Sequence, residues 1–269
     1  MRAGFIERTL AGLLAASDYA ASAEQIASSG GVLQRIDPRV KVAGLLALVV
    51  AAASARRQPA IDALFAAAFL LAALSHIRVA RLMAWVWTPV LFFTGTIALP
   101  AVFLTPGPTA AVFGPLTITE TGLASALLLL SRAETCATLA ALLVLTTPWP
   151  WVLKALRVFR CPAVLVAILG MTYRYIFVIL ETALDMFESR KSRTVGVLEP
   201  ADRRRLAAAS AGVLLSKSLQ LSSDVHLAMQ SRGFRGEVYL LDEFRAGPAD
   251  WLWSGAFAMA AVAALWWGR

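Results

Sequence analysis

The stretch Leu82–Leu104, LMAWVWTPVLFFTGTIALPAVFL, has 23 residues and no charged side chain. About 20 consecutive apolar residues in a helix cross the hydrocarbon core of a bilayer, so this stretch predicts a membrane-spanning helix. Pro89 and Pro100 lie inside it, and such prolines are tolerated in lipid when neighbouring groups satisfy the carbonyls that they free. The stretch favours a membrane protein over a water-soluble one.

The composition of the whole chain leads to the same class. Of its 269 residues, 59% are hydrophobic and 16% are charged, whereas a soluble domain has about 25% charged residues. The net charge is +8. A basic chain can indicate nucleic-acid binding, but the long apolar runs disfavour it, and we expect no nucleic-acid partner. The excess of cations on the cytoplasmic side of membrane proteins explains the charge better.

Four more apolar runs predict four more spans, at Val40–Ala55, Ile61–Leu74, Gly122–Leu145 and Trp251–Trp267. The predicted fold is all-α, a polytopic membrane protein with about five transmembrane helices and long cytoplasmic amphipathic coupling helices. The expected organisation is an N-terminal amphipathic segment (1–35), helices 1–4 (36–148), a cytoplasmic coupling domain (149–247) and a C-terminal transmembrane helix (248–269). Thr105–Thr119, rich in Pro and Gly, is expected to be a loop.

The block between the fourth and last runs is amphipathic and basic. It holds 14 of the 25 lysines and arginines, from Lys154 to Arg245, so we expect it in the cytoplasm. The N-terminus then lies inside and the C-terminus outside, in the cell inner or plasma membrane. Arg56 and Arg57 fall outside, against this rule. If Ala163–Leu180 were a sixth span, the C-terminus would lie inside instead.

Two small motifs lie at the predicted ends of the two long helices of this block: Ser192-Arg193-Thr194 and Ser231-Arg232-Gly233. An arginine near a helix C-terminus complements the helix dipole, and basic residues beside a membrane bind anionic lipid. Alternatively, the rigid guanidinium could enter a groove on a partner protein and pair with a carboxylate there. Arg190 and Arg235 are possible secondary docking residues.

Five motifs in a fixed order resemble the T component of energy-coupling factor transporters, and within it the cobalt-type CbiQ branch. The resemblance covers roughly residues 30 to 267. The residues that carry it are Asp37-Pro38-Arg39-Val40-Lys41, Leu145-Thr146-Thr147-Pro148-Trp149-Pro150, Tyr173-Arg174-Tyr175-Ile176-Phe177 and the two arginine motifs, the second within Met229–Glu237.

The resemblance implies a role in an ATP-driven importer. The T component links two cytoplasmic ATPase subunits to a membrane substrate-binding subunit, here a metal-specific CbiM-like protein, possibly with a small CbiN-like one. Arg193 and Arg232 would be the docking arginines. Ser192 and Thr194 stand where the family often has Ala and Gly, so Arg190 could compete with Arg193 for the role. Cobalt is the substrate implied by the branch; nickel or a vitamin is the alternative.

The sequence contains no phosphate-binding loop of the Gly-x-x-x-x-Gly-Lys-Ser/Thr type. We therefore expect a non-catalytic chain without a cofactor, with ATP and Mg bound by the partner ATPases, and no metal site. A lipid-modifying membrane enzyme is the rival hypothesis, for which Arg132, Glu134 and Glu120 are the candidate groups. Otherwise Arg132 and Glu134 contact the substrate-binding partner or pair with other helices.

The entry motif has its own interpretation. Asp37, Arg39 and Lys41 precede or begin the first apolar run. Charged side chains at that position usually extend to the membrane surface, so we expect these three to be interfacial anchors.

Overall fold

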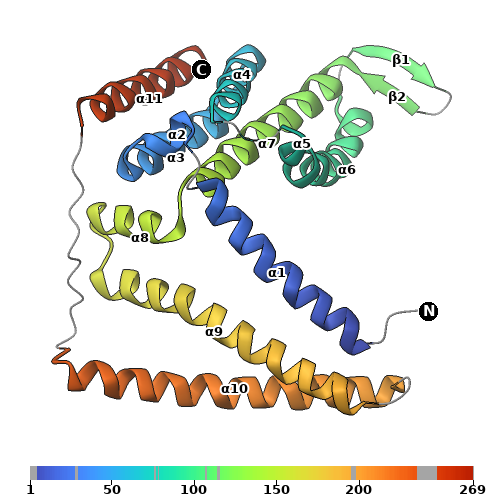
Figure 1. Cartoon of the computed structure of the whole chain (residues 1–269). Helices are drawn as coiled ribbons and strands as arrows, with labels where there is room; N and C mark the ends of the chain where they lie inside the picture. Colours follow the sequence, from blue (N-terminus) through green and yellow to red (C-terminus); the bar gives the residue numbers. More distant parts are fainter. Residues whose placement is uncertain are drawn as a thin grey trace. The chain divides into compact units, whose positions relative to one another are not determined.

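The computed structural model describes residues 5–27, 30–75, 77, 79–106, 108–113, 116–194, 198–234 and 247–268 (Figure 1). Most of these residues are helical, and the strands among them form one hairpin, so the predicted helical fold class is confirmed. The elements are α1 (Phe5–Ala27), α2 (Val32–Arg35), α3 (Pro38–Ser54), α4 (Gln58–Leu74), α5 (Val79–Leu82), the π-helix η1 (Met83–Trp87), α6 (Thr88–Leu104), β1 (Thr109–Phe113), β2 (Leu116–Thr119), α7 (Glu120–Thr146), α8 (Trp149–Val158), α9 (Ala163–Arg193), α10 (Pro200–Ser231) and α11 (Pro248–Trp267).

The chain divides into two compact units. Unit 1 comprises Met1–Ala23 and Leu156–Glu243, and unit 2 comprises Glu24–Ala155 and Phe244–Arg269. Unit 1 therefore contains most of α1 together with α9 and α10, while unit 2 contains α2 to α7 and α11. The cytoplasmic location of the coupling segment 149–247 stays a prediction.

Among the residues that the structure describes, four helices are long and apolar enough to cross a bilayer: Met83–Phe103, Glu120–Thr146, Ala163–Arg193 and Pro248–Trp267. Three of them were predicted as spans, and the fourth, α9, contains the alternative sixth span. The first two predicted spans correspond to α3 and α4, which have 17 residues each, or about 26 Å of helix. The chain is a multi-pass membrane protein, and its total number of spans stays a prediction.

The core of unit 2 lies where α3, α7 and α11 meet. Leu45 and Leu48 of α3, Leu142 of α7 and Phe257 of α11 are all buried there. Gly44 allows the close approach, because a Cβ atom at this position would lie 2.5 Å from Cδ2 of Phe257. The aromatic ring of α11 therefore packs directly on the backbone of α3.

Two cations of unit 2, the buried Lys41 and the half-buried Arg132, satisfy backbone carbonyls near proline breaks. Lys41, 2% exposed, donates from Nζ to the carbonyl oxygen of Thr146 at 2.9 Å. Arg132 donates from Nη2 to the carbonyl oxygen of Ala55 at 2.6 Å. The residues four places on, Pro150 and Pro59, have no N–H with which to continue a helical ladder. In lipid, such a carbonyl needs a partner from elsewhere in the protein.

The prediction that Lys41 and Asp37 are interfacial anchors is wrong. Both are buried, and Asp37 is the N-cap of α3, with its carboxylate accepting from the backbone N–H of Arg39 at 2.8 Å. The backbone N–H of Asp37 donates to Oδ1 of Asp250 at 2.9 Å, and Oδ2 of Asp250 accepts from the backbone N–H of Gly247. Asp250 thus joins the starts of α3 and α11. Arg39 is half-buried.

The segment expected as a loop contains an antiparallel hairpin of β1 and β2, in which Val112 pairs with Thr117. The short strands lie between turn residues, which is why the composition indicated a loop. Thr119 ends the hairpin and caps α7, since its hydroxyl accepts from the N–H of Gly122 at 3.2 Å and donates to the carbonyl of Thr105 at 2.9 Å.

A π-helical turn, η1, precedes the first proline of the long apolar stretch. The hydroxyl of Thr88 donates to the carbonyl oxygen of Met83 at 2.8 Å, and the indole N–H of Trp87 donates to the hydroxyl of Thr138 on α7 at 3.0 Å. The wider turn thus accommodates Pro89 while its polar groups find partners within unit 2.

Candidate docking site

The first arginine motif lies at the end of α9. Arg193 is the last helical residue, and Thr194 is the extended C-cap with φ −101° and ψ 115°. The hydroxyl of Ser192 donates to the carbonyl of Ser189 at 2.8 Å, and the hydroxyl of Thr194 donates to the carbonyl of Arg190 at 2.8 Å. Both flanking hydroxyls thus bond to the helix itself, and the exposed Arg193 is the cation at its end.

The second motif ends α10 in a Schellman turn. Arg232 is the C-cap, and Gly233 follows in the left-handed region with φ +81°. The N–H of Gly233 donates to the carbonyl of Gln230 at 2.9 Å, and the N–H of Phe234 donates to that of Met229 at 3.0 Å. These are the two bonds of the motif. The sequence prediction that α10 ends at Gly233 is confirmed, and the turn leaves Arg232 exposed.

The two arginines differ from the neighbouring candidates. Within the described residues, neither the Arg193 nor the Arg232 guanidinium bonds to another group. Arg190 lies one turn before the end of α9 and is half-buried. Arg235 lies outside the described residues, so its predicted secondary role is not addressed. Position at the helix end therefore favours Arg193 over Arg190, and docking itself stays a prediction.

The two motifs lie at opposite ends of α10. Arg193 ends α9 seven residues before α10 begins, where the two helices lie side by side (Figure 1), and Arg232 follows the last residue of α10. With 32 residues, α10 is about 48 Å long at 1.5 Å per residue. Unit 1 therefore presents two exposed guanidinium groups separated by approximately the length of α10.

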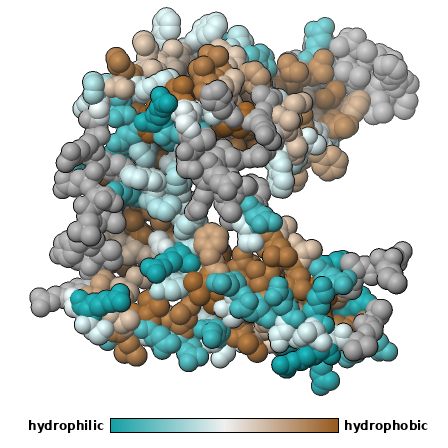
Figure 2. All heavy atoms as spheres, in the orientation of Figure 1, coloured by the Kyte–Doolittle hydropathy of each residue, from teal (hydrophilic) through white to brown (hydrophobic). Residues whose placement is uncertain are grey.

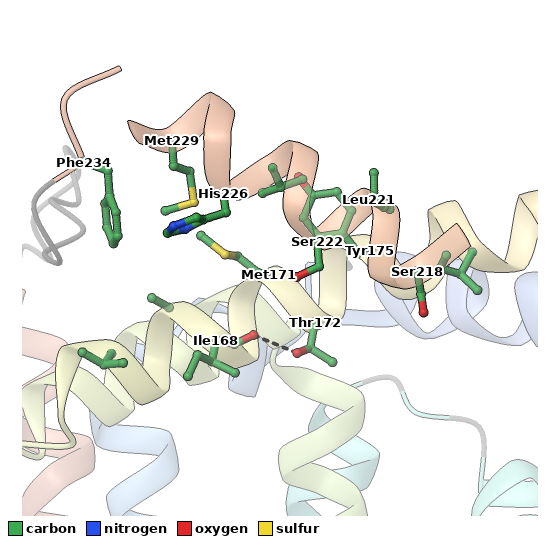
Figure 3. A pocket seen from close by; sticks show the side chains of 14 residues that line it. Ile168, Met171, Thr172, Tyr175, Ser218, Leu221, Ser222, His226, Met229 and Phe234 are labelled. Atoms are coloured by element: carbon green, nitrogen blue, oxygen red, sulfur yellow. Dashed lines mark hydrogen bonds between the residues drawn. The ribbon is translucent and has the colours of Figure 1, made fainter. Parts of the chain in front are cut away.

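A groove of about 460 Å³ lies between the first half of α9 and the last half of α10. Met171 of α9 faces His226 and Met229 of α10 across it, Tyr175 of α9 lies near Ser222, and Phe234, just after the second motif, closes one end (Figure 3). The groove thus adjoins Arg232. This groove was not predicted from the sequence, although the spacing of Ile168, Met171 and Tyr175 along one helix face was a signal for it.

Apolar side chains are exposed on both long helices of unit 1, among hydrophilic ones (Figure 2). On α9 these are Val164, Leu165, Ile168, Leu169, Ile176 and Val178, and on α10 they are Val213, Leu215, Leu219 and Leu227. Exposed apolar side chains that gather in this way on a helix mark contacts with a protein or a membrane.

The groups named for the rival enzyme hypothesis are not brought together. Glu120 is in the first turn of α7 and Glu134 is 14 residues further along, about 21 Å away at the helical rise. Arg132 bonds to the carbonyl of Ala55. Glu134 is 8% exposed, and neither of its carboxylate oxygens has a hydrogen-bond partner within the described residues. Of the two alternatives for Arg132, contact with a substrate-binding partner or pairing with another helix, the structure shows pairing with the end of α3.

Known proteins resemble most of this chain. The model of the CbiQ family, described as cobalt transport protein, matches residues 29–240. An uncharacterised protein of Methanocaldococcus jannaschii is 34% identical over 220 residues, which is 80% of this chain and 75% of that protein. The cobalt transport protein CbiQ of Rhodobacter capsulatus is 31% identical over 160 residues, 57% of this chain and 64% of that protein. With its apolar helices and exposed arginine motifs, the chain belongs to the CbiQ family of cobalt transport proteins.

Proposed function

We propose that this chain is the energy-coupling membrane subunit of an ATP-driven cobalt importer, and that it is not itself catalytic. It joins two cytoplasmic ATPase subunits, which bind ATP and Mg, to a CbiM-like substrate-binding subunit in the plasma membrane, with or without a small CbiN-like subunit. The observation that carries this proposal is the placement of Arg193 and Arg232, exposed at opposite ends of α10. Two separate cations of this kind suit two separate ATPase copies.

The local structure of the two helix ends supports docking. A planar guanidinium forms two parallel bonds with a carboxylate, and a helix end presents it clear of neighbouring side chains. Ser192, Thr194 and Ser231 bond to carbonyls of their own helices, and Gly233 has no side chain. Small neighbours allow each arginine to enter a groove on the partner. The exposed apolar faces of α9 and α10 suit the membrane partner.

The test is retention of the ATPases and uptake of cobalt by variants of the co-expressed complex. Truncation of one member of a buried charged pair costs about 2–5 kcal/mol. Either Arg193→Ala or Arg232→Ala alone leaves a second, effectively intramolecular contact, so we expect partial retention. The double variant should release the ATPases or uncouple hydrolysis from uptake. Lysine should not fully replace either arginine, because it lacks the planar fork.

The matched controls are Arg190→Ala and Arg204→Ala. Arg204 is exposed in the first turns of α10, whereas its neighbour Arg203 bonds to the carbonyl of Leu198 at 2.8 Å and has a structural role. Attraction to anionic lipid, at about 1 kcal/mol per cation, would affect all four arginines alike. Equal damage from the control pair and the motif pair would refute docking.

A further inference from the structure

The N-terminal helix α1 packs beside the first arginine motif. Ile6 and Leu10, one turn apart on α1, are 6% and 7% exposed, and they bury the ring of Phe187 of α9, which is 6% exposed. We call these three residues the α1 cluster. The partly buried Leu184 of α9 packs against it, and so do Leu198 and Leu206, which follow Arg193 in the chain. The helix thus contacts both segments that flank Arg193.

Little else is buried in unit 1. Within its described residues, the buried side chains besides the α1 cluster are those of Ala183 and Ser210, and no residue in the apolar half of α9 is buried. A helix end with few buried contacts frays and opens locally at low free energy. The α1 cluster is therefore the main apolar packing that holds the end of α9 to the start of α10.

The cluster is near one arginine and far from the other. Phe187 precedes Arg193 by six residues, about 9 Å along the axis of α9, whereas Arg232 follows Leu206 by 26 residues, about 39 Å along α10. A change in α1 should therefore alter the presentation of Arg193 and leave that of Arg232 largely unchanged.

We propose that α1 is a positioning element for the first docking arginine: its packing on Phe187 fixes the direction in which α9 ends and so presents Arg193 to an ATPase subunit. This inference rests on the proposed docking function. Fixing a binding group beforehand lowers the ordering cost of association. Residues 5–27 lie outside the range 29–240 that the family model matches, so this role is additional to what that model covers.

A groove at the same place extends the contact surface. It is lined by Glu7, Leu10, Ala11 and Leu14 of α1 and by Glu188, Lys191 and Ser192 of α9. Ser192 belongs to the first arginine motif, so a partner that takes Arg193 also lies beside α1. A membrane-surface anchor is the other role open to an amphipathic helix, but it would leave Ile6 and Leu10 against lipid rather than against Phe187.

A double-mutant cycle on the full complex tests the proposal. The variant Ile6→Ala/Leu10→Ala is combined separately with Arg193→Ala and with Arg232→Ala, and the apparent Kd for the ATPase subunits is measured in each background. We expect the α1 variant alone to raise this Kd about tenfold, within the range of measured coupling between interacting residues. The increase should disappear in the Arg193→Ala background and persist in the Arg232→Ala background.

The controls separate positioning from general damage. Arg8, exposed on the same helix and outside both the α1 cluster and the groove beside Ser192, gives the control variant Arg8→Ala, which should bind like the original protein. Ile6→Val/Leu10→Met, which keeps most of the buried volume, should restore binding. If the double alanine variant aggregates, Leu10→Ala alone takes its place in the cycle.

The outcomes distinguish this inference from the proposed function. If Arg193→Ala and Arg232→Ala do not weaken ATPase binding even together, docking itself is refuted. If they do weaken it, while the α1 variant binds normally or adds its full effect in the Arg193→Ala background, docking stands and positioning by α1 is refuted.

Discussion

The ammonium nitrogen of Lys41 lies 2.9 Å from the carbonyl oxygen of Thr146, so a side chain from the first turn of α3 completes the end of α7. The two residues belong to the Asp37–Lys41 and Leu145–Pro150 motifs, which are more than 100 positions apart in the chain. This one contact links the two motifs: the proline break frees a carbonyl, and the lysine satisfies it.

Replacement of Lys41 by methionine should destabilise unit 2. The side chain keeps its approximate length, but the Thr146 carbonyl loses its donor in a buried place, at a cost of about 1–3 kcal/mol. The measurement is the thermal transition of the detergent-purified complex. Arg35→Met, an exposed cation in α2, is the control. A transition temperature for Lys41→Met equal to that of the control would contradict the structural role.

Gly44→Ala should separate α3 from α11. The new methyl group would lie 2.5 Å from the Phe257 ring, and such overpacking costs about 1–3 kcal/mol. Gly95→Ala in α6 is the control, because a Cβ atom there meets nothing within 4 Å. The melting temperature should fall for Gly44→Ala alone, and trimming of Phe257 to leucine should recover part of the loss.

Gly233→Ala should weaken ATPase binding through the backbone. The residue has φ +81°, and the left-handed conformation costs an L-residue about 1–2 kcal/mol, so the Schellman turn that leaves Arg232 exposed becomes less populated. We expect reduced ATPase retention, smaller in effect than Arg232→Ala.

Gly212→Ala is a matched control on the same helix. This glycine lies inside α10 without a positive φ, and a Cβ atom there would meet nothing within 4 Å. Alanine should stabilise the helix there by about 0.5–1 kcal/mol. Nonspecific damage would not explain a loss of ATPase retention for Gly233→Ala, just after α10, together with normal retention for Gly212→Ala inside the helix. Equal losses of retention for the two variants would contradict the role of the turn.

The cation-rich block should face the cytoplasm. Single cysteines at Glu199, at the start of α10, and at Gly107, between α6 and β1, are compared in a background without Cys136 and Cys161. An impermeant thiol reagent applied to intact cells should label the cysteine at position 107 and spare that at 199, because cations accumulate on the inside. The reverse labelling pattern would overturn the topology.

The start of α9 and the end of α10 could be predicted from the sequence, because Pro162 is a strong local signal for a helix start and Gly233 is one for a helix stop. The burial of Lys41 could not, since a lysine near the start of an apolar helix has the same local pattern whether it reaches lipid headgroups or a distant carbonyl. The α1 cluster was missed for a similar reason. Ile6 and Leu10 have helical spacing, but their partner Phe187 is 177 positions further along the chain than Leu10.

The pairing of these two cations with proline-freed carbonyls has a consequence for how related sequences can diverge. Lys41 and Arg132 serve the carbonyls of Thr146 and Ala55, which the prolines at 150 and 59 leave without a ladder partner. A lineage that loses one of these prolines and extends the helix no longer needs the cation, and one that loses the cation must lose the proline too. Each proline and its cation should therefore vary together across homologues, as a co-varying pair linked through a carbonyl oxygen of a third residue.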